Sequence, residues 1–321
     1  MTKLTRLAIL DDYQGKTLSL AGWGPLQREM AVQVFQDTVS DLDTLAKRLA
    51  PFDAILAMRE RTAFTQALLE RLPNLKLLIT TGMRNRSIDI AACNARGITV
   101  CGTPGFGNPT VEITWGLILN LSRGLPKDEA DLRRGIWQPR LGHTVEGKTL
   151  GVMGLGNLGA RVAKVGQALG MKVIAWSQNL TAEKAEAAGA TLVSKNELME
   201  QADVLTLHLV LSDRSRGIVG PADLARMKNS AIIINTSRGP LIDQPALIAA
   251  LKEGRIAGAG LDVFDIEPLP PGHPILAAPN TMLTPHLGYV SEENYRVYFN
   301  AAVENIQAFQ AGTPVRVLAA G

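Results

Sequence analysis

The chain has 321 residues, of which 46% are hydrophobic and 20% charged, and its formal net charge at pH 7 is +3. Such values are typical of an ordinary globular protein of about two domains, and neither the small charge nor its distribution favours nucleic acid or a membrane as partner. No apolar window reaches transmembrane length, and the run Leu7–Leu10 is too short for a signal-peptide core. Cys93 and Cys101 both lie in apolar segments, which indicates buried, reduced thiols and a cytoplasmic protein.

The first hundred residues alternate short apolar strands with helical stretches, which predicts a parallel sheet with helices on both faces. The expected strands are Arg6–Leu10, Ala31–Phe35, Asp53–Met58, Lys76–Thr80 and Ile98–Cys101. The expected helices are Asp41–Leu49, Gln66–Leu72 and Ile88–Ala95. Several glycines and prolines then interrupt the pattern at 102–109, which indicates a hinge between domains, and a strongly apolar helix follows at Thr110–Leu121.

A second alternating series begins at Leu150 and continues to about Pro285. Its expected strands are Gly151–Met153, Lys172–Trp176, Thr191–Val193, Val204–Leu207, Ala231–Asn235, Ala257–Leu261 and Thr281–Thr284. The tail, Ser291–Ala311, reads as one long amphipathic helix. We expect it to return to the first domain, because the second series already completes a doubly wound unit.

A glycine-rich loop opens the second series. A short strand leads into Gly154-x-Gly156-x-x-Gly159, and a helix follows at about Leu158–Leu169. In a dinucleotide site the first glycine makes a tight turn, the second admits the pyrophosphate and the third lets helix and strand pack closely. With the next strand at the right distance, this context predicts a dinucleotide site. The expected contacts in the loop are Gly154, Gly156, Asn157, Leu158 and Gly159.

The end of the strand Lys172–Trp176 bears on the choice between NAD and NADP. An acidic residue there would bind the ribose 2′-hydroxyl and repel a 2′-phosphate. Here Ser177 stands in that place, and Gln178 follows it. Neither carries charge, so both cofactors remain possible, with NADP slightly favoured.

Four separated motifs resemble the D-isomer-specific 2-hydroxyacid dehydrogenase family, and they occur in the same order along the chain. They are Gly147–Gly151, Asn235–Gly239, Gly260–Pro268 and Thr284–Gly288. The resemblance implies an α/β protein of two Rossmann-like, doubly wound parallel-sheet domains with the active site in the cleft between them. A flavodoxin-like substrate-binding domain would comprise 1–103 and 287–321, and a dinucleotide-binding Rossmann domain 104–286.

Reduction of a 2-keto acid requires a hydride, a proton for the carbonyl oxygen and a cation for the carboxylate. Arg238 can hold a carboxylate with two parallel hydrogen bonds, and His286 can give and take a proton near neutrality. A carboxylate at Glu267 would orient the imidazole and favour its protonated form. The resemblance implies the same three roles. Thr236 and Asp262 are expected on the cofactor side, the latter by its match to a family aspartate near the nicotinamide carboxamide.

Two loops of the first domain are candidates for substrate contacts. Arg59 and Arg61 lie in a segment similar to the Arg-x-Arg-Thr of phosphoglycerate dehydrogenases, and Arg84 follows Met83 where relatives have a second glycine. Exposed arginines are common, so the alternative for each of these three arginines is a solvent-exposed side chain that does not contact substrate. Together these residues favour a small anionic or polar acid as substrate.

The sequence therefore predicts an NAD(P)-dependent oxidoreductase that interconverts a 2-keto acid and a D-2-hydroxy acid, without a metal site. The alternative is a nicotinamide-sensing interaction protein, because some corepressors resemble these dehydrogenases. The resemblance also implies a homodimer built on the dinucleotide-binding domains, with Arg133–Leu141 as an arm across the partner. The remaining histidines, at 143, 208 and 273, are interpreted as structural or exposed.

Overall fold

The computed structural model describes residues 3–319 and divides the chain into two compact units. Unit 1 consists of the residues up to Gly107 together with those from Val290 onward, and unit 2 is Asn108–Tyr289. Both divisions fall a few residues after the boundaries expected from the sequence, so the residues that follow His286 belong to unit 2 as far as Tyr289.

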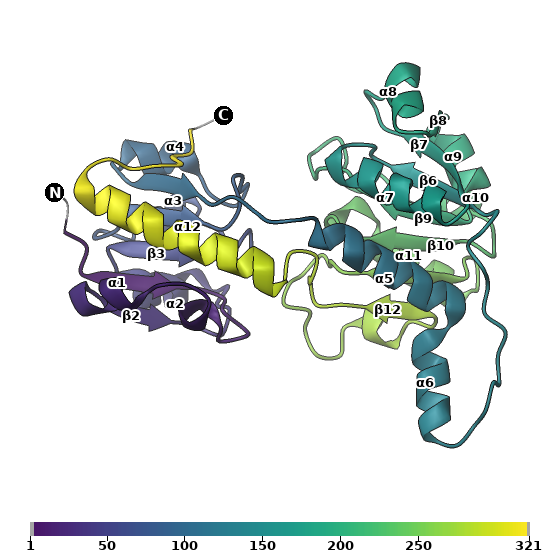
Figure 1. The fold of residues 1–321 in the computed structure, drawn as a ribbon, viewed down its shortest axis with the longest axis horizontal. Coiled ribbons are helices and arrows are strands. Elements are labelled where there is room, and N and C mark those ends of the chain that lie inside the picture. Colours follow the sequence, from purple (N-terminus) through teal and green to yellow (C-terminus); the bar gives the residue numbers. More distant parts are fainter. Residues whose placement is uncertain (1–2, 320–321) are drawn as a thin grey trace. The chain divides into compact units, whose positions relative to one another are not determined.

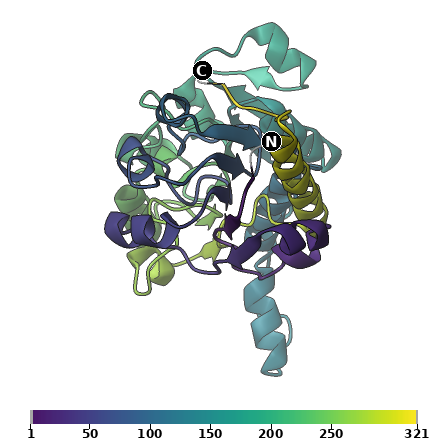
Figure 2. The same cartoon turned by 90° about the vertical axis from the view of Figure 1, so that its left-hand side faces the viewer.

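Unit 1 is built on a parallel sheet with the strand order β2-β1-β3-β4-β5. The strands are β1 (Arg6–Ile9), β2 (Ala31–Val34), β3 (Ala54–Ala57), β4 (Leu77–Thr80) and β5 (Thr99–Gly102). Strands β3 and β4 are buried along their whole length, as expected for apolar runs covered on both faces. One face packs against α2 (Leu42–Leu49), α3 (Gln66–Leu69) and α4 (Ile90–Ala95). The other carries α1 (Gly24–Glu29) and α12 (Glu292–Ala311), as Figure 2 shows.

Unit 2 contains a parallel sheet with the order β12-β11-β10-β9-β6-β7-β8. Its strands are β6 (Thr149–Met153), β7 (Lys172–Trp176), β8 (Thr191–Leu192), β9 (Val204–Leu207), β10 (Ile232–Asn235), β11 (Gly258–Leu261) and β12 (Thr281–Leu283). Helices α5 (Pro109–Arg123) and α7 (Asn157–Ala168) cover one face. The other face packs against α9 (Lys195–Gln201), α10 (Pro221–Arg226) and α11 (Gln244–Lys252). The short α8 (Ala182–Ala187) precedes β8.

An arm formed by residues 125–144 projects from the body of unit 2 (Figure 1). Gly124, with a φ of +67°, ends α5 and starts α6 (Leu125–Arg133), because a left-handed residue breaks the helix. The buried carboxylate of Asp131 accepts hydrogen bonds from Arg134 and Arg140 and so fastens the returning segment. The arm is thus an ordered element, although its helix was not expected from the sequence.

The expected fold class is confirmed, since both sheets are parallel and both carry helices on either face. Every strand expected from the sequence is present within residues 3–319, with ends shifted by a residue or two. Within the same residues, no helix combines the length and apolar character needed to cross a membrane.

Candidate active site

The glycine-rich loop between β6 and α7 has the geometry that a dinucleotide needs. Gly154 has a φ of +102°, and a Cβ on it would lie 2.8 Å from the backbone carbon of His208. A Cβ on Gly159 would overlap the Gly154 carbonyl oxygen, so this glycine lets α7 pack against the loop. A Cβ on Gly156 would meet nothing within 4 Å. The space beside Gly156, at the N-terminus of a twelve-residue helix, therefore fits a pyrophosphate.

The loop lies beside the end of β7, because the Gly154 N–H donates to the Trp176 carbonyl oxygen at 2.8 Å. Ser177, the next residue, is half-buried, and Gln178 is exposed. Their side chains can bind a hydroxyl or a phosphate by hydrogen bonds, without the charge that would exclude a phosphate. The residues present therefore fit either nicotinamide dinucleotide.

His286 and Glu267 form a close polar pair at this edge of unit 2. The His286 Nδ1 and Glu267 Oε2 atoms lie 2.5 Å apart, and the two side chains are 19% and 24% exposed. The other Glu267 oxygen, Oε1, accepts the Phe264 N–H at 2.9 Å, which fixes the carboxylate on its own loop. The Tyr289 ring meets the imidazole edge to face at 5.5 Å. The Glu267 contact at Nδ1 and the Tyr289 ring together fix the orientation of the imidazole.

Asp262 binds residues on both sides of His286. Its side chain is fully buried and accepts hydrogen bonds from the Thr284 hydroxyl at 2.5 Å, from the Leu287 N–H at 2.7 Å and from the Gly288 N–H at 2.8 Å. Burial raises the pKa of Asp262, while these donors and the nearby His286 lower it. His286 itself has a φ of +55°, which a non-glycine residue adopts only when its surroundings impose it.

Arg238 follows β10 in a loop whose backbone is held by two hydrogen bonds to the Asn235 side chain. The Asn235 carboxamide is 1% exposed; it accepts the Ser237 N–H at 3.0 Å and donates to the Arg238 carbonyl oxygen at 2.9 Å. The Arg238 Nη1 atom donates to the Ser237 carbonyl oxygen at 2.6 Å. Asn235 was not predicted from the sequence as a site residue. A buried amide at the end of an apolar strand was the available signal, since such a group needs a hydrogen-bond partner.

The loops with Arg238, Glu267 and His286 follow β10, β11 and β12, which are neighbours in the sheet. A close approach connects the first two loops, because a Cβ on Gly239 would overlap the Phe264 carbonyl group. Parallel strands present their carboxyl ends at one edge, and ligands bind there in open α/β sheets. Unit 2 thus brings a guanidinium, a carboxylate and an imidazole to the edge that carries the glycine loop.

Thr236 and His208 lie at the same edge. The hydroxyl groups of Thr236 and Thr114 are 2.8 Å apart, which ties β10 to α5. His208 follows β9, and its Nε2 atom lies 2.9 Å from the Thr206 hydroxyl. Burial lowers the pKa of His208 to about 4, so the imidazole is neutral at physiological pH. Its Nδ1 atom has no partner within the described residues.

In unit 1, the loops after β3 and β4 carry the arginines expected to bind substrate. Arg59 has a φ of +52° and donates its N–H to the Thr81 hydroxyl at 2.9 Å. The Asn85 amide donates to the Arg59 carbonyl oxygen at 2.5 Å. The Arg59 guanidinium occupies the space in which a Cβ on Gly82 would lie. Thr81 and Asn85 therefore both bind the backbone of Arg59. Asn85 is buried and was also not predicted from the sequence.

The other expected substrate residues of unit 1 differ in exposure. Met83 is 46% exposed and Arg84 is also exposed. Arg61 is half-buried, and its guanidinium carbon lies 4.9 Å from the centre of the Tyr13 ring. The structure thus gives Arg61 a defined setting and leaves the side chains of Met83 and Arg84 open to solvent.

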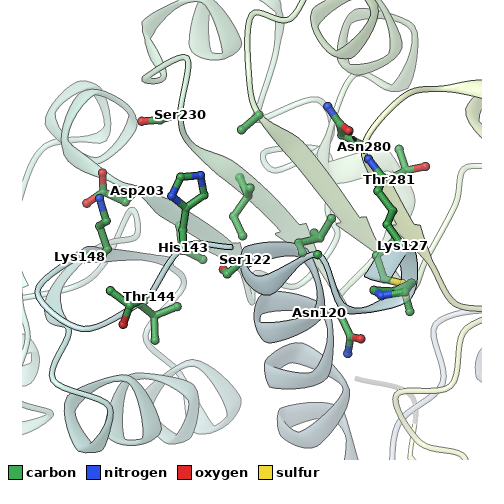
Figure 3. Close-up of a pocket in the computed structure, with 18 residues that line it drawn as sticks. Asn120, Ser122, Lys127, His143, Thr144, Lys148, Asp203, Ser230, Asn280 and Thr281 are labelled. Atoms are coloured by element: carbon green, nitrogen blue, oxygen red, sulfur yellow. Dashed lines mark hydrogen bonds between the residues drawn. The ribbon is translucent and has the colours of Figure 1, made fainter. Parts of the chain in front are cut away.

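A cavity of about 360 Å³ lies elsewhere in unit 2, as Figure 3 shows. Lys148, Asp203, Ser230 and Asn280 line it, and each comes just before a strand of the sheet. The cavity is therefore at the amino ends of the strands, opposite the glycine loop. It belongs to neither the dinucleotide loop nor the His286 cluster.

A glycine loop before a helix, with arginine, glutamate and histidine side chains at the same carboxyl edge of one parallel sheet, is typical of an oxidoreductase that uses a nicotinamide cofactor. Comparison with known proteins gives its family. Residues 115–288, more than half of the chain, match the family model for the D-isomer specific 2-hydroxyacid dehydrogenase, NAD binding domain. The chain belongs to this family. It is an NAD(P)-dependent enzyme that interconverts 2-keto acids and D-2-hydroxy acids.

Individual relatives agree with this assignment. A glyoxylate reductase of Aeropyrum pernix is 38% identical over 255 residues, which are 76% of each chain. The crystal structure of a phosphoglycerate oxidoreductase from Vibrio cholerae is similar with a TM-score of 0.90 and 40% identity over 96% of this chain and 100% of that chain. An acyclic imino acid reductase in complex with NADPH and D-Arg has a TM-score of 0.76 and 28% identity over 98% of this chain and 100% of that one. The alternative of a nicotinamide-sensing interaction protein finds no support among these relatives.

Proposed function

We propose that His286, Glu267 and Arg238 carry the reaction in this chain. The observation that supports this is the contact of the Glu267 carboxylate with the His286 Nδ1 atom, which leaves Nε2 to hold the transferable proton. In the direction of reduction, Nε2 gives its proton to the carbonyl oxygen of the keto acid while Glu267 stabilises the imidazolium before transfer. Arg238 binds the substrate carboxylate. The cofactor, with its pyrophosphate held at the glycine loop, would supply the hydride from its nicotinamide ring.

The substrate is a small 2-keto acid with a second anionic or polar group. Arg59 and Arg61 support this proposal, because a guanidinium recognises carboxylate and phosphate well and both side chains have defined surroundings. Met83 and Arg84 are further substrate contacts in this proposal. The relatives named above include enzymes for acids with and without a second anionic group. Glyoxylate has no such group, whereas a phosphoglycerate has a phosphate.

The test is a panel of 2-keto acids, each with NADH and with NADPH, followed by loss of nicotinamide absorbance. We expect turnover with at least one acid and formation of the D-hydroxy product by chiral chromatography. A protein that binds NADH or NADPH but turns over no acid would contradict the proposal.

For the cofactor, we propose that NADPH is used at least as well as NADH. Ser177→Asp is expected to restore a clear NADH preference, because a carboxylate would face the 2′-phosphate in a partly buried place, where like charges cost several kcal/mol. The measurement is kcat/KM for both cofactors in the wild type and the variant, with Ser177→Asn as the uncharged control. A wild type that prefers NADH about a hundredfold (~3 kcal/mol) would place the discrimination elsewhere in the loop.

We further propose a homodimer formed through the arm of unit 2. Trp137 and Leu141 support it, because they are 74% and 96% exposed, and large apolar surfaces of this kind mark interfaces. We expect light scattering to give a dimer mass at micromolar concentration and Trp137→Glu/Leu141→Glu to give a monomer. Val315→Glu, at an exposed apolar residue of unit 1, is the matched control and should leave the mass unchanged. A monomeric wild type would contradict the proposal.

A cytoplasmic location is also proposed. Cys93 and Cys101 are both free and buried, and burial raises the pKa of each thiol to about 11. Two unpaired thiols suit a reducing compartment. Fractionation of cells that express a tagged chain tests this, and recovery in an extracytoplasmic fraction would overturn it.

A further inference from the structure

The buried carboxylate of Asp11 joins three loops at the carboxyl edge of the unit 1 sheet. Asp11 follows β1 and is 1% exposed. Its Oδ1 atom accepts a hydrogen bond from the Thr38 hydroxyl, and its Oδ2 atom accepts one from the Thr62 hydroxyl at 2.8 Å. Thr38 comes after β2 and Thr62 after β3, the two strands on either side of β1. One side chain thus holds both neighbouring strand ends.

The same cluster surrounds Arg61. The Tyr13 hydroxyl bonds to the Thr38 hydroxyl, and the Tyr13 ring lies under the Arg61 guanidinium, with 4.9 Å from the guanidinium carbon to the ring centre. Burial raises the pKa of Asp11, and the positive charge of Arg61 acts in the opposite direction. The two hydroxyl groups that bind Asp11 are neutral. Arg61 is therefore held by an aromatic face and by attraction to a buried negative charge.

The adjacent residue, Asp12, is equally buried, but among the described residues its carboxylate binds only residues of its own loop. Its carboxylate oxygens accept the N–H groups of Lys16 and Thr17 at 3.1 and 3.0 Å, at the start of the short helix Thr17–Ser19. A loop of this kind needs only hydrogen-bond acceptors. Asp11, in contrast, ties the loop that contains both Arg59 and Arg61 to the rest of the sheet. The difference makes Asp12 a matched control for Asp11.

We propose that Asp11 and Tyr13 are positioning residues that hold the Arg61 guanidinium for the second anionic group of the substrate. By fixing this arginine, they select 2-keto acids with a distal carboxylate or phosphate over glyoxylate, which has none. This inference rests on the proposed function of the chain as a 2-keto acid reductase. It adds the two residues that determine specificity through Arg61 without touching the substrate.

The experiment compares the wild type with Asp11→Asn, Tyr13→Leu, Asp12→Asn and Arg61→Met. Each is assayed with glyoxylate, 2-oxoglutarate and 3-phosphohydroxypyruvate, with the preferred cofactor at saturation. Asparagine keeps the shape of Asp11, and because the two hydroxyl groups can donate or accept, the ties to both loops survive while the charge is lost. Tyr13 is only half-buried, so Tyr13→Leu supplies a variant that folds even where Asp11→Asn does not. Thermal unfolding of each variant monitors the fold.

We expect the wild type to prefer at least one of the two acids that carry a distal anionic group, 2-oxoglutarate or 3-phosphohydroxypyruvate. Asp11→Asn and Tyr13→Leu should raise KM for that acid about tenfold and change kcat less than about threefold, with glyoxylate kinetics within about twofold. Asp11→Asn in an Arg61→Met background should add no further loss, because its effect acts through Arg61. Asp12→Asn should lower the unfolding temperature without changing the ratio of kcat/KM values between acids.

Parallel losses with glyoxylate and with the two acids that carry a distal anionic group would overturn the positioning role and leave the reductase function intact. The same follows from a wild type that prefers glyoxylate, or from Asp12→Asn shifting the preference as Asp11→Asn does. A wild type that reduces none of the acids of the broader panel with either cofactor would instead overturn the proposed function, and this inference with it.

Discussion

Replacing His286 with asparagine is expected to lower kcat by about two orders of magnitude or more, because general acid catalysis contributes roughly 10²–10⁴-fold. Asparagine is chosen because His286 has a φ of +55°, and asparagine adopts the left-handed region more readily than most residues. The variant should keep its fold and its affinity for the cofactor, since the glycine loop lies on other strands. Steady-state kinetics and fluorescence titration with NADPH measure the two effects separately.

The matched control is Tyr289→Phe, which keeps the aromatic edge against the imidazole. It should change kcat little. Near-normal turnover in His286→Asn would remove His286 from the mechanism, and a parallel loss of cofactor affinity would assign the residue to the dinucleotide site.

The second large effect is expected at Arg238. Arg238→Gln should raise KM for the keto acid steeply and lower kcat as well, with a combined loss on the order of 2–5 kcal/mol, as found when one partner of a buried charge pair is removed. Glutamine can still donate a hydrogen bond. The loss in kcat/KM therefore measures the contribution of the Arg238 charge and of its two parallel hydrogen bonds to the substrate carboxylate. The measurement is kcat and KM for the best acid of the panel.

Arg226→Gln serves as the control, since Arg226 is exposed and pairs with Glu200 at the surface of unit 2 at 3.2 Å. It should leave both kinetic constants unchanged. If Arg238→Gln weakens only cofactor binding, Arg238 belongs to the dinucleotide site instead.

The strands, the glycine loop and the three chemical groups could all be read from the sequence, since each depends on local pattern. A buried parallel strand requires a short apolar run, so the sequence predicts β3, β4 and β10 directly. The tight turn at Gly154 requires a residue without a side chain. Arg238, Glu267 and His286 were predicted because each stands in a short motif that follows a strand and resembles a motif of the family.

The partners of buried polar groups were decided only by the tertiary structure. Asp11 and Thr62 are 51 residues apart, Asp262 and Gly288 are 26 apart, and in both pairs the carboxylate is buried. Sequence alone does not reveal such pairs, because strand order determines which loop ends meet, and strand order follows from the packing of the whole sheet. The cost of leaving a buried polar group unpaired then requires that the loops which meet supply each other's hydrogen bonds. For this chain, local pattern determined which chemistry is present, and the order of the strands decided which side chains hold it in place.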